Sequence, residues 1–188
     1  MKVYKINWDF SHLIKNQYDL LVIDKFESIP NHASIKSILN EEIPKEINFK
    51  ANFSNIHNVN YPVNDLALPI INRKIFDVFF ETVKPRKVVK INIYHNGKQI
   101  DNSVFCTFQL NEYFDCFDYD NSVYESNFIL PITNISKFFV KQSNFPDVFR
   151  INLCIPDLYV NEKIKNKIDA IGIKDIVFEE VEIYDKLS

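Results

Sequence analysis

Glycine is scarce in this sequence: the 188-residue chain contains only Gly97 and Gly172. Average usage of about 7% would give roughly a dozen. The two glycines lie too far apart to share a local motif. Glycine-rich nucleotide-binding loops, phosphate loops and the G-x-S-x-G nucleophile elbow each need several glycines close together for backbone reasons. The scarcity of glycine therefore excludes these three classes of site.

Histidine and cysteine lack the spacing of metal sites. No two histidines are separated by three residues or fewer, as a helical zinc motif would require; they are His12, His32, His57 and His95. The three cysteines, Cys106, Cys116 and Cys154, contain no C-x-x-C pair. An odd number of cysteines in a chain of this size favours buried thiols in a reducing compartment. We therefore expect neither a metal nor a cofactor.

Long apolar runs are also missing. Residues 1–25 carry charges throughout and show no apolar segment of the kind found in a signal peptide. No run approaches the roughly 18 apolar residues of a membrane-spanning helix. The expected compartment is the cytoplasm, with no membrane partner.

Charge is distributed unevenly along the chain. Residues 1–90 contain 13 basic and 10 acidic residues, whereas residues 91–188 contain 9 basic and 15 acidic residues. No lysine or arginine lies between Lys98 and Lys137, a stretch that holds six acidic residues. Such a stretch weighs against binding to nucleic acid, whose phosphates require basic side chains. It favours a basic partner, although a solvated acidic face is the ordinary alternative.

Residues 88–110 predict a β-hairpin. Asn96-Gly97 is the favoured pair for a two-residue type I′ turn, because both central residues need positive φ. Such a turn pairs His95 with Lys98, so we expect His95 to be a turn residue rather than a ligand. The register then continues as Ile93 with Ile100, Ile91 with Asn102, and Val89 with Val104.

Two helices are predicted from apolar stripes that follow an asparagine. Asn72 can cap a helix over residues 72–83, and Asn161 can cap a second helix that ends at Gly172. Candidate strands are residues 3–6, 20–23, 47–53, 148–155 and 176–184. The pattern predicts an α+β fold in which two or three helices pack on a mixed or antiparallel sheet. Residues 1–64 are expected to form an irregular N-terminal lobe, and residues 65–188 an α+β domain, within one compact unit.

The acidic segment contains the candidate catalytic groups. Asp115, Asp118 and Asp120 could perform acid–base chemistry if burial gave them unlike environments. A loop that faces a partner, or a structural loop, is the other interpretation. In a structural loop, Asp118 and Ser122 would bond the backbone as an Asx or Ser turn.

An ordered series of short motifs covers about two thirds of the chain. These are residues 65–72 (DLALPIIN), 105–111 (FCTFQLN), 114–122 (FDCFDYDNS), 148–150 (VFR), 159–165 (YVNEKIK), and 172–173 (GI) followed by 177–178 (VF). In this order they resemble the bacterial immunity proteins of family eleven. Asn161 stands where that family often has serine, and Asn121 where it often has lysine, which leaves the loop here more acidic. Residues 1–64 lie outside the resemblance.

The resemblance implies a protein that is not an enzyme. Proteins of this kind bind a cognate secreted toxin and neutralise it in the cytoplasm of the producing cell. The expected mechanism is occlusion of a basic active site by an acidic surface. The residues expected to bind the toxin are Asp115, Asp118, Tyr119, Asp120, Tyr124 and Glu125. The alternative is a small hydrolase or ligand-binding regulator of unknown substrate that uses Asp115, Asp118 and Asp120.

Overall fold

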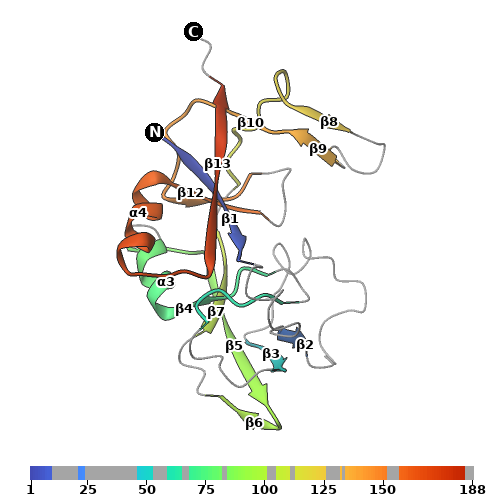
Figure 1. The fold of residues 1–188 in the computed structure, drawn as a ribbon, viewed down its shortest axis with the longest axis vertical. Coiled ribbons are helices and arrows are strands. Elements are labelled where there is room, and N and C mark those ends of the chain that lie inside the picture. The colour runs from blue at the N-terminus through green and yellow to red at the C-terminus, as the bar shows by residue number, and fades with distance from the viewer. Residues whose placement is uncertain are drawn as a thin grey trace.

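A computed structural model gives the fold of the chain (Figure 1). It describes residues 1–9, 21–23, 46–52, 59–64, 68–81, 84–100, 105–110, 113–125, 132, 134–151 and 157–184. Within these ranges the chain forms thirteen strands in three sheets, and two helices. The described part of the protein is therefore built mainly from β-structure.

The first sheet has five strands around β1. Their order is β10 (Phe139–Lys141), β13 (Ile176–Tyr184), β1 (Val3–Trp8), β12 (Leu158–Asn161) and β11 (Val148–Phe149). The central strand β1 is antiparallel to both β12 and β13, while β10 runs parallel to β13. The strand nearest the N-terminus thus pairs with strands from the C-terminal quarter of the chain.

Side chains alternate between two buried faces of this sheet. Tyr4 and Ile6 on β1 face a central core that also contains Ile164 and Ile168 of the second helix. Val3, from the same strand, faces a second cluster, which we call the barrel core. The barrel core consists of Val3, Cys116, Phe117, Val140, Phe145, Phe149, Ile151, Tyr159 and Val181. Burial of both faces explains why apolar residues occupy successive positions in these strands.

Residues 114–122, which we call the strap, connect the two edges of the first sheet. Phe114 forms a parallel bridge to Ile151, just beyond edge strand β11. Phe117 forms an antiparallel bridge to Val140 in the opposite edge strand, β10. The strap and the first sheet enclose the barrel core between them, and we call this sheet the half-barrel.

The second sheet contains the predicted hairpin. Its order is β2 (Leu21–Ile23), β3 (Glu46–Ala51), β5 (Lys87–His95), β7 (Phe105–Gln109) and β4 (Ile71–Asn72), and β6 (Lys98–Gln99) pairs with β5. A third, two-stranded sheet joins β8 (Val123–Glu125) to β9 (Asn134–Lys137). In Figure 1 this third sheet and β6 lie at opposite ends of the molecule.

The two helices begin at the predicted asparagine caps. Helix α3 spans Arg73–Phe79, and the Asn72 side chain accepts a hydrogen bond from the Ile75 amide at 3.0 Å. Helix α4 spans Glu162–Ala170, and Asn161 accepts from the Ile164 amide at 3.1 Å. Gly172 follows α4 with φ +74°, the left-handed conformation predicted for the end of this helix.

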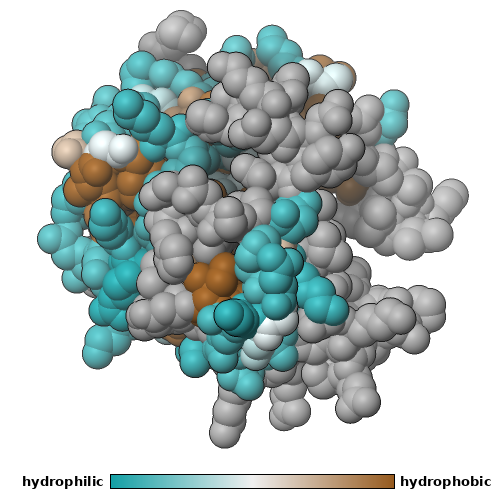
Figure 2. Space-filling view, turned by 60° about the horizontal axis from the view of Figure 1, so that its bottom comes forward, coloured by the Kyte–Doolittle hydropathy of each residue, from teal (hydrophilic) through white to brown (hydrophobic). Residues whose placement is uncertain are grey.

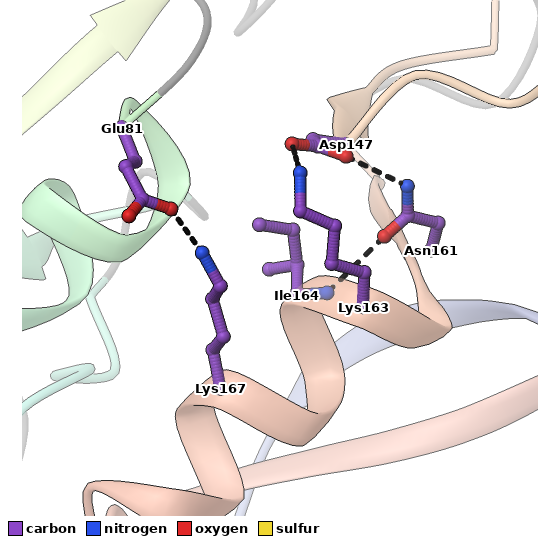
Figure 3. A network of polar contacts seen from close by, with 6 residues as sticks. All are labelled: Glu81, Asp147, Asn161, Lys163, Ile164 and Lys167. Atoms are coloured by element: carbon purple, nitrogen blue, oxygen red, sulfur yellow. Dashed lines mark hydrogen bonds and ion pairs between the residues drawn. The ribbon is translucent and has the colours of Figure 1, made fainter.

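Polar contacts around α4 fix it to its surroundings (Figure 3). Asp147 accepts hydrogen bonds from the Asn161 side-chain amide at 2.9 Å and from Lys163 at 2.7 Å. Lys167 forms an ion pair with Glu81, which lies two residues beyond the end of α3. The cap of α4 is thus held in position by a residue upstream of the helix, and α4 is tied to the end of α3.

The expectation of an α+β fold with two or three helices packed on a sheet is wrong. The described residues contain only two short helices, of seven and nine residues, against three sheets that include a half-barrel. The physical reason is that the strap covers one face of the first sheet, so this face needs no helix to bury its apolar side chains. Strands of two to four residues, such as β11 and β8, are also too short to show an alternating pattern.

Two predicted elements have other bounds in the structure. The first helix is shorter than residues 72–83. Strand β11 covers only the beginning of residues 148–155, of which 152–155 lie outside the described residues.

The predicted turn is confirmed, but the register beyond it is wrong. His95 pairs with Lys98, and the Ile100 amide donates to the Ile93 carbonyl at 2.8 Å. Further along, Val89 pairs with Thr107 rather than with Val104. Strand β7 is therefore displaced by three residues from the predicted pairing. Because β7 buries side chains on both faces, its apolar pattern cannot specify which residue lies opposite Val89. Val104 and Asn102 lie outside the described residues.

Strands from residues 1–64 pair with strands from later parts of the chain. β1 pairs with β12 and β13, and β3 pairs in parallel with β5. The division of the chain into an irregular lobe and a later domain stays a prediction. No helix within the described ranges is long and apolar enough to cross a membrane.

Candidate functional site

Backbone hydrogen bonds hold the strap to both edges of the half-barrel. The Phe114 amide donates to the Arg150 carbonyl at 2.7 Å on one edge. On the other edge, the Lys141 backbone amide donates to the Cys116 carbonyl at 2.8 Å, and the Asp118 backbone amide donates to the Phe139 carbonyl at 3.1 Å. The path of the strap is therefore determined by segments that follow it in the sequence.

Asp118 organises the turn at the centre of the strap. One carboxylate oxygen accepts from the backbone amides of Asp120 and Asn121 at 3.2 and 3.3 Å. The other oxygen accepts from the side-chain amide of Asn121 at 2.8 Å. The Asp118 residue is 3% exposed. A carboxylate that bonds successive backbone amides in this way forms an Asx turn, the structural alternative considered for this residue.

Ser122 fixes the end of the turn to β10. Its hydroxyl oxygen accepts from the Phe139 amide at 3.0 Å and lies 3.3 Å from the Phe139 carbonyl, to which the hydroxyl donates. Its own amide donates to the Asp118 carbonyl at 3.0 Å. One side chain thus bonds both backbone groups of Phe139, whose carbonyl also accepts from the Asp118 amide.

Aromatic rings connect the turn to the barrel core. The buried ring of Phe117 contacts Tyr119 and Tyr124 edge to face, with ring centroids 4.9 and 5.7 Å apart. Tyr119 and Tyr124 also contact each other at 6.0 Å. Tyr119 keeps 42% of its surface exposed. An aromatic side chain held in this way can contact a partner without a large loss of side-chain entropy.

The structure separates the six predicted binding residues by exposure. Asp115, Tyr119, Asp120 and Glu125 are exposed, Tyr124 is half-buried, and Asp118 is buried. The two tyrosines are brought into contact across the turn. Asp118 lies inside the turn, so its carboxylate contacts the backbone rather than the surface. Whether any of these residues binds a toxin stays a prediction.

Sequence reasoning missed Val123, which is 54% exposed at the start of β8. Large exposed hydrophobic side chains are scattered elsewhere on the molecule, and Figure 2 shows hydrophobic residues as small patches among hydrophilic ones. Tyr119 and Val123 are two such side chains within one short segment. The only sequence signal for Val123 was its apolar side chain next to an acidic turn. An apolar residue in a strand can be either buried or exposed, so this signal could not identify Val123 as a surface residue.

Basic side chains border this surface. Lys137 on β9 pairs with Val123, and its ammonium lies 4.7 Å from the centre of the Phe139 ring. Lys141 follows on β10. The strand pairing brings these lysines beside the acidic segment, although the sequence places them at or beyond its end. The surface is therefore acidic at its centre and mixed in charge at its border.

Arg150 is a second polar group that sequence reasoning did not single out as functional. It is 3% exposed, and burial lowers the pKa of its guanidinium, while Tyr61, Tyr113 and Asp157 raise that pKa. Burial raises the pKa of Tyr61. Asp157 also forms an ion pair with Lys5 at 2.8 Å. A charged group therefore lies inside the protein, and Asp157 is the one carboxylate among these three neighbours.

The two described thiols are buried or half-buried, and the described histidine lies at the end of a strand. Burial raises the pKa of the Cys106 thiol to about 12, which makes it a poor nucleophile. Cys116 is buried in the barrel core, and Cys154 lies outside the described residues. His95, at the end of β5, lies 3.1 Å from the Ala51 carbonyl through Nδ1. Within the described ranges, no three histidine, cysteine or acidic residues lie close enough together to hold a metal ion.

No known family model matches the chain, and no curated protein matches it. The resemblance to the immunity proteins therefore depends on the short motifs alone.

Proposed function

We propose that the protein binds a cognate bacterial toxin through the exposed side of the strap and β8, and neutralises it without catalysis. The proposal combines the motif resemblance with the character of this surface. It includes a cytoplasmic location, because the toxin would have to be neutralised inside the producing cell.

One observation carries the proposal: exposed carboxylates and an exposed aromatic ring are presented by a backbone that is fixed at both ends. Asp115 and Asp120 project from the strap, and Tyr119 lies on the buried ring of Phe117. Groups that are already in position lose little conformational entropy when they bind. A surface of this kind suits a tight protein–protein contact.

The proposed mechanism is occlusion. Enzymes that act on anionic substrates present basic active sites, and a carboxylate surface is complementary to such a site in charge. Complementary charge speeds the encounter, while a partly buried aromatic side chain supplies most of the affinity once water is excluded. Covering the active site then prevents the toxin from reaching its substrate.

The test is co-expression with the product of the neighbouring toxin gene, followed by affinity capture and measurement of association rates. We expect a stable complex and an association rate that falls as salt concentration rises. In the triple variant Asp115→Asn, Asp120→Asn and Glu125→Gln, we expect slower association with a weaker dependence on salt.

A matched control removes the same number of charges from residues outside the strap and β8. The variant Asp77→Asn, Asp169→Asn and Glu179→Gln has the same net charge, and it should associate at close to the wild-type rate. A neighbouring gene that encodes no toxin, or a toxin that remains active when the protein is present in excess, would exclude the proposed function. Equal slowing in both triple variants would show that net charge, rather than this surface, guides the encounter.

A further inference from the structure

The motif at residues 116–122 divides into buried and exposed positions. Cys116, Phe117 and Asp118 are 2%, 1% and 3% exposed, and Ser122 is 9% exposed. Between them, Tyr119 is 42% exposed and Asp120 is also exposed. This part of the strap therefore contains positions that a partner cannot reach beside positions that it can.

We propose that Cys116, Phe117, Asp118 and Ser122 are positioning residues, and that Tyr119 and Asp120 determine which partner is bound. This inference rests on the proposed function, and it deepens it by separating two roles within the strap. It changes the role of Asp118 from a contact residue to a residue that acts through its neighbours.

The hydrogen bonds of Asp118 support the positioning role. Both carboxylate oxygens face the turn, where they accept from the amides of Asp120 and Asn121 and from the Asn121 side chain. A partner could reach this carboxylate only after the turn had opened. Opening would expose backbone amides and cost their hydrogen bonds, so Asp118 contributes more by closing the turn than by contacting a partner.

The other three residues fix the ends of the turn. Cys116 and Asp118 bond to β10 through their backbones, Phe117 fills the barrel core, and Ser122 binds both backbone groups of Phe139. None of these contacts depends on the identity of residues 119 and 120. The two exposed positions can therefore vary in sequence while the turn keeps its shape, as partner choice requires.

The first experiment measures amide hydrogen exchange in the free protein, so it needs no toxin. Asp118→Asn keeps an oxygen that can accept from the amides of residues 120 and 121, whereas Asp118→Ala removes both acceptors. We expect exchange at these two amides to rise about tenfold in Asp118→Ala, the factor that corresponds to the loss of one to two hydrogen bonds. In Asp118→Asn we expect the rates to stay within about threefold of wild type.

The second experiment measures binding to the toxin that co-expression and affinity capture identify. Asp118→Asn should bind with nearly wild-type affinity although it has lost a charge, and Asp118→Ala should bind at least about tenfold more weakly. Tyr119→Ala and Asp120→Asn should weaken binding by a similar factor while exchange and melting temperature stay unchanged. Rescue by the neutral asparagine is the result that a direct charge contact would not give.

The outcomes separate this inference from the proposed function. If the wild-type protein binds no toxin, the proposed function fails, while the exchange data still decide the positioning role of Asp118. If the wild-type protein binds and Asp118→Asn loses as much affinity as Asp118→Ala, Asp118 is a contact residue and the inference is wrong. If exchange is the same in all three proteins, Asp118 does not hold the turn, and the inference is equally wrong.

Discussion

Two turns of this protein, at residues 96–97 and 118–122, are stabilised by different means. The Asn96–Gly97 turn joins β5 to β6 with positive φ at both residues, 50° and 74°. A Cβ added to Gly97 would meet no atom within 4 Å, so the surroundings do not constrain this turn. The turn at residues 118–122 contains no residue with positive φ. It is held by the Asp118 carboxylate and by the bonds of Ser122 to Phe139, 17 residues later.

The difference shows which residues determine the conformation of each turn. The first turn depends on the conformational preferences of its own two residues, which can be recognised in the sequence. The second depends on an edge strand and a core that form only when the half-barrel assembles. A change at a distance should therefore disrupt the second turn and leave the first unaffected.

The largest effect is expected from Phe117→Ala, which removes the ring that the strap places in the barrel core. Phe117 is 1% exposed and contacts the rings of Tyr119, Tyr124 and Phe138. Loss of a buried phenylalanine usually lowers the free energy of unfolding by about 3–5 kcal/mol. Urea denaturation measures this loss, with Tyr119→Ala as the exposed control, for which we expect less than about 1 kcal/mol. Similar losses for both variants would show that the strap is not anchored through Phe117.

Ser122→Ala should have an intermediate effect. It leaves the Phe139 amide without the oxygen that accepts from it at 3.0 Å. An unsatisfied backbone amide in a partly buried site costs about 1–3 kcal/mol. Ser136→Ala is the matched control, because the Ser136 hydroxyl donates to the Val123 carbonyl in an exposed position. Thermal denaturation should show a clear loss for Ser122→Ala and a change within about 0.5 kcal/mol for Ser136→Ala.

A smaller effect is expected from Gly97→Ala in the local turn. The φ of +74° is strained for any residue with a Cβ, and no neighbour opposes the added methyl group. Strain alone should lower stability by about 1 kcal/mol, without changing amide exchange in the strap. Lys98→Ala, at the next position, should cost less because its backbone is already extended in β6. Faster exchange in the strap of Gly97→Ala would show that the two turns are coupled.

Local features of the fold could be predicted from the sequence because their causes are local. The Asn96–Gly97 turn and the caps Asn72 and Asn161 each depend on contacts within a few residues. Gly172 was placed correctly for the same reason. Each cap joins a side chain to a backbone amide three residues later, and the turn and Gly172 depend on residues that accept positive φ.

The arrangement of the sheets could not be predicted, because it depends on pairings between distant segments. Nothing near Val3 indicates that β1 lies between β12 and β13. The three-residue displacement of β7 involves residues that are buried or half-buried on both faces of the strand. In the candidate site, the acidic and aromatic residues were recognisable by type. The inward orientation of Asp118 depends on how the turn folds against β10, which sequence spacing does not record.

The smallest effect concerns Glu81 and Lys167, an exposed pair that joins the ends of two helices (Figure 3). The hydrogen bond and the charge of Lys167 lower the pKa of the Glu81 carboxyl below its ordinary value of 4.5. A lowered folded-state pKa stabilises the protein above the unfolded value, and this contribution is lost as pH falls through the folded pKa. The contribution should be small, because both side chains are solvated.

Removing the lysine tests this contact directly. In Lys167→Gln, we expect the Glu81 pKa, followed by NMR of the carboxyl group, to rise toward its ordinary value. Lys165→Gln is the control, because Lys165 pairs with Asp169 at 2.6 Å rather than with Glu81. It removes the same charge from the same helix, so the Glu81 pKa should change little. Equal shifts in both variants would show that Glu81 responds to the general positive charge of α4 rather than to a contact with Lys167.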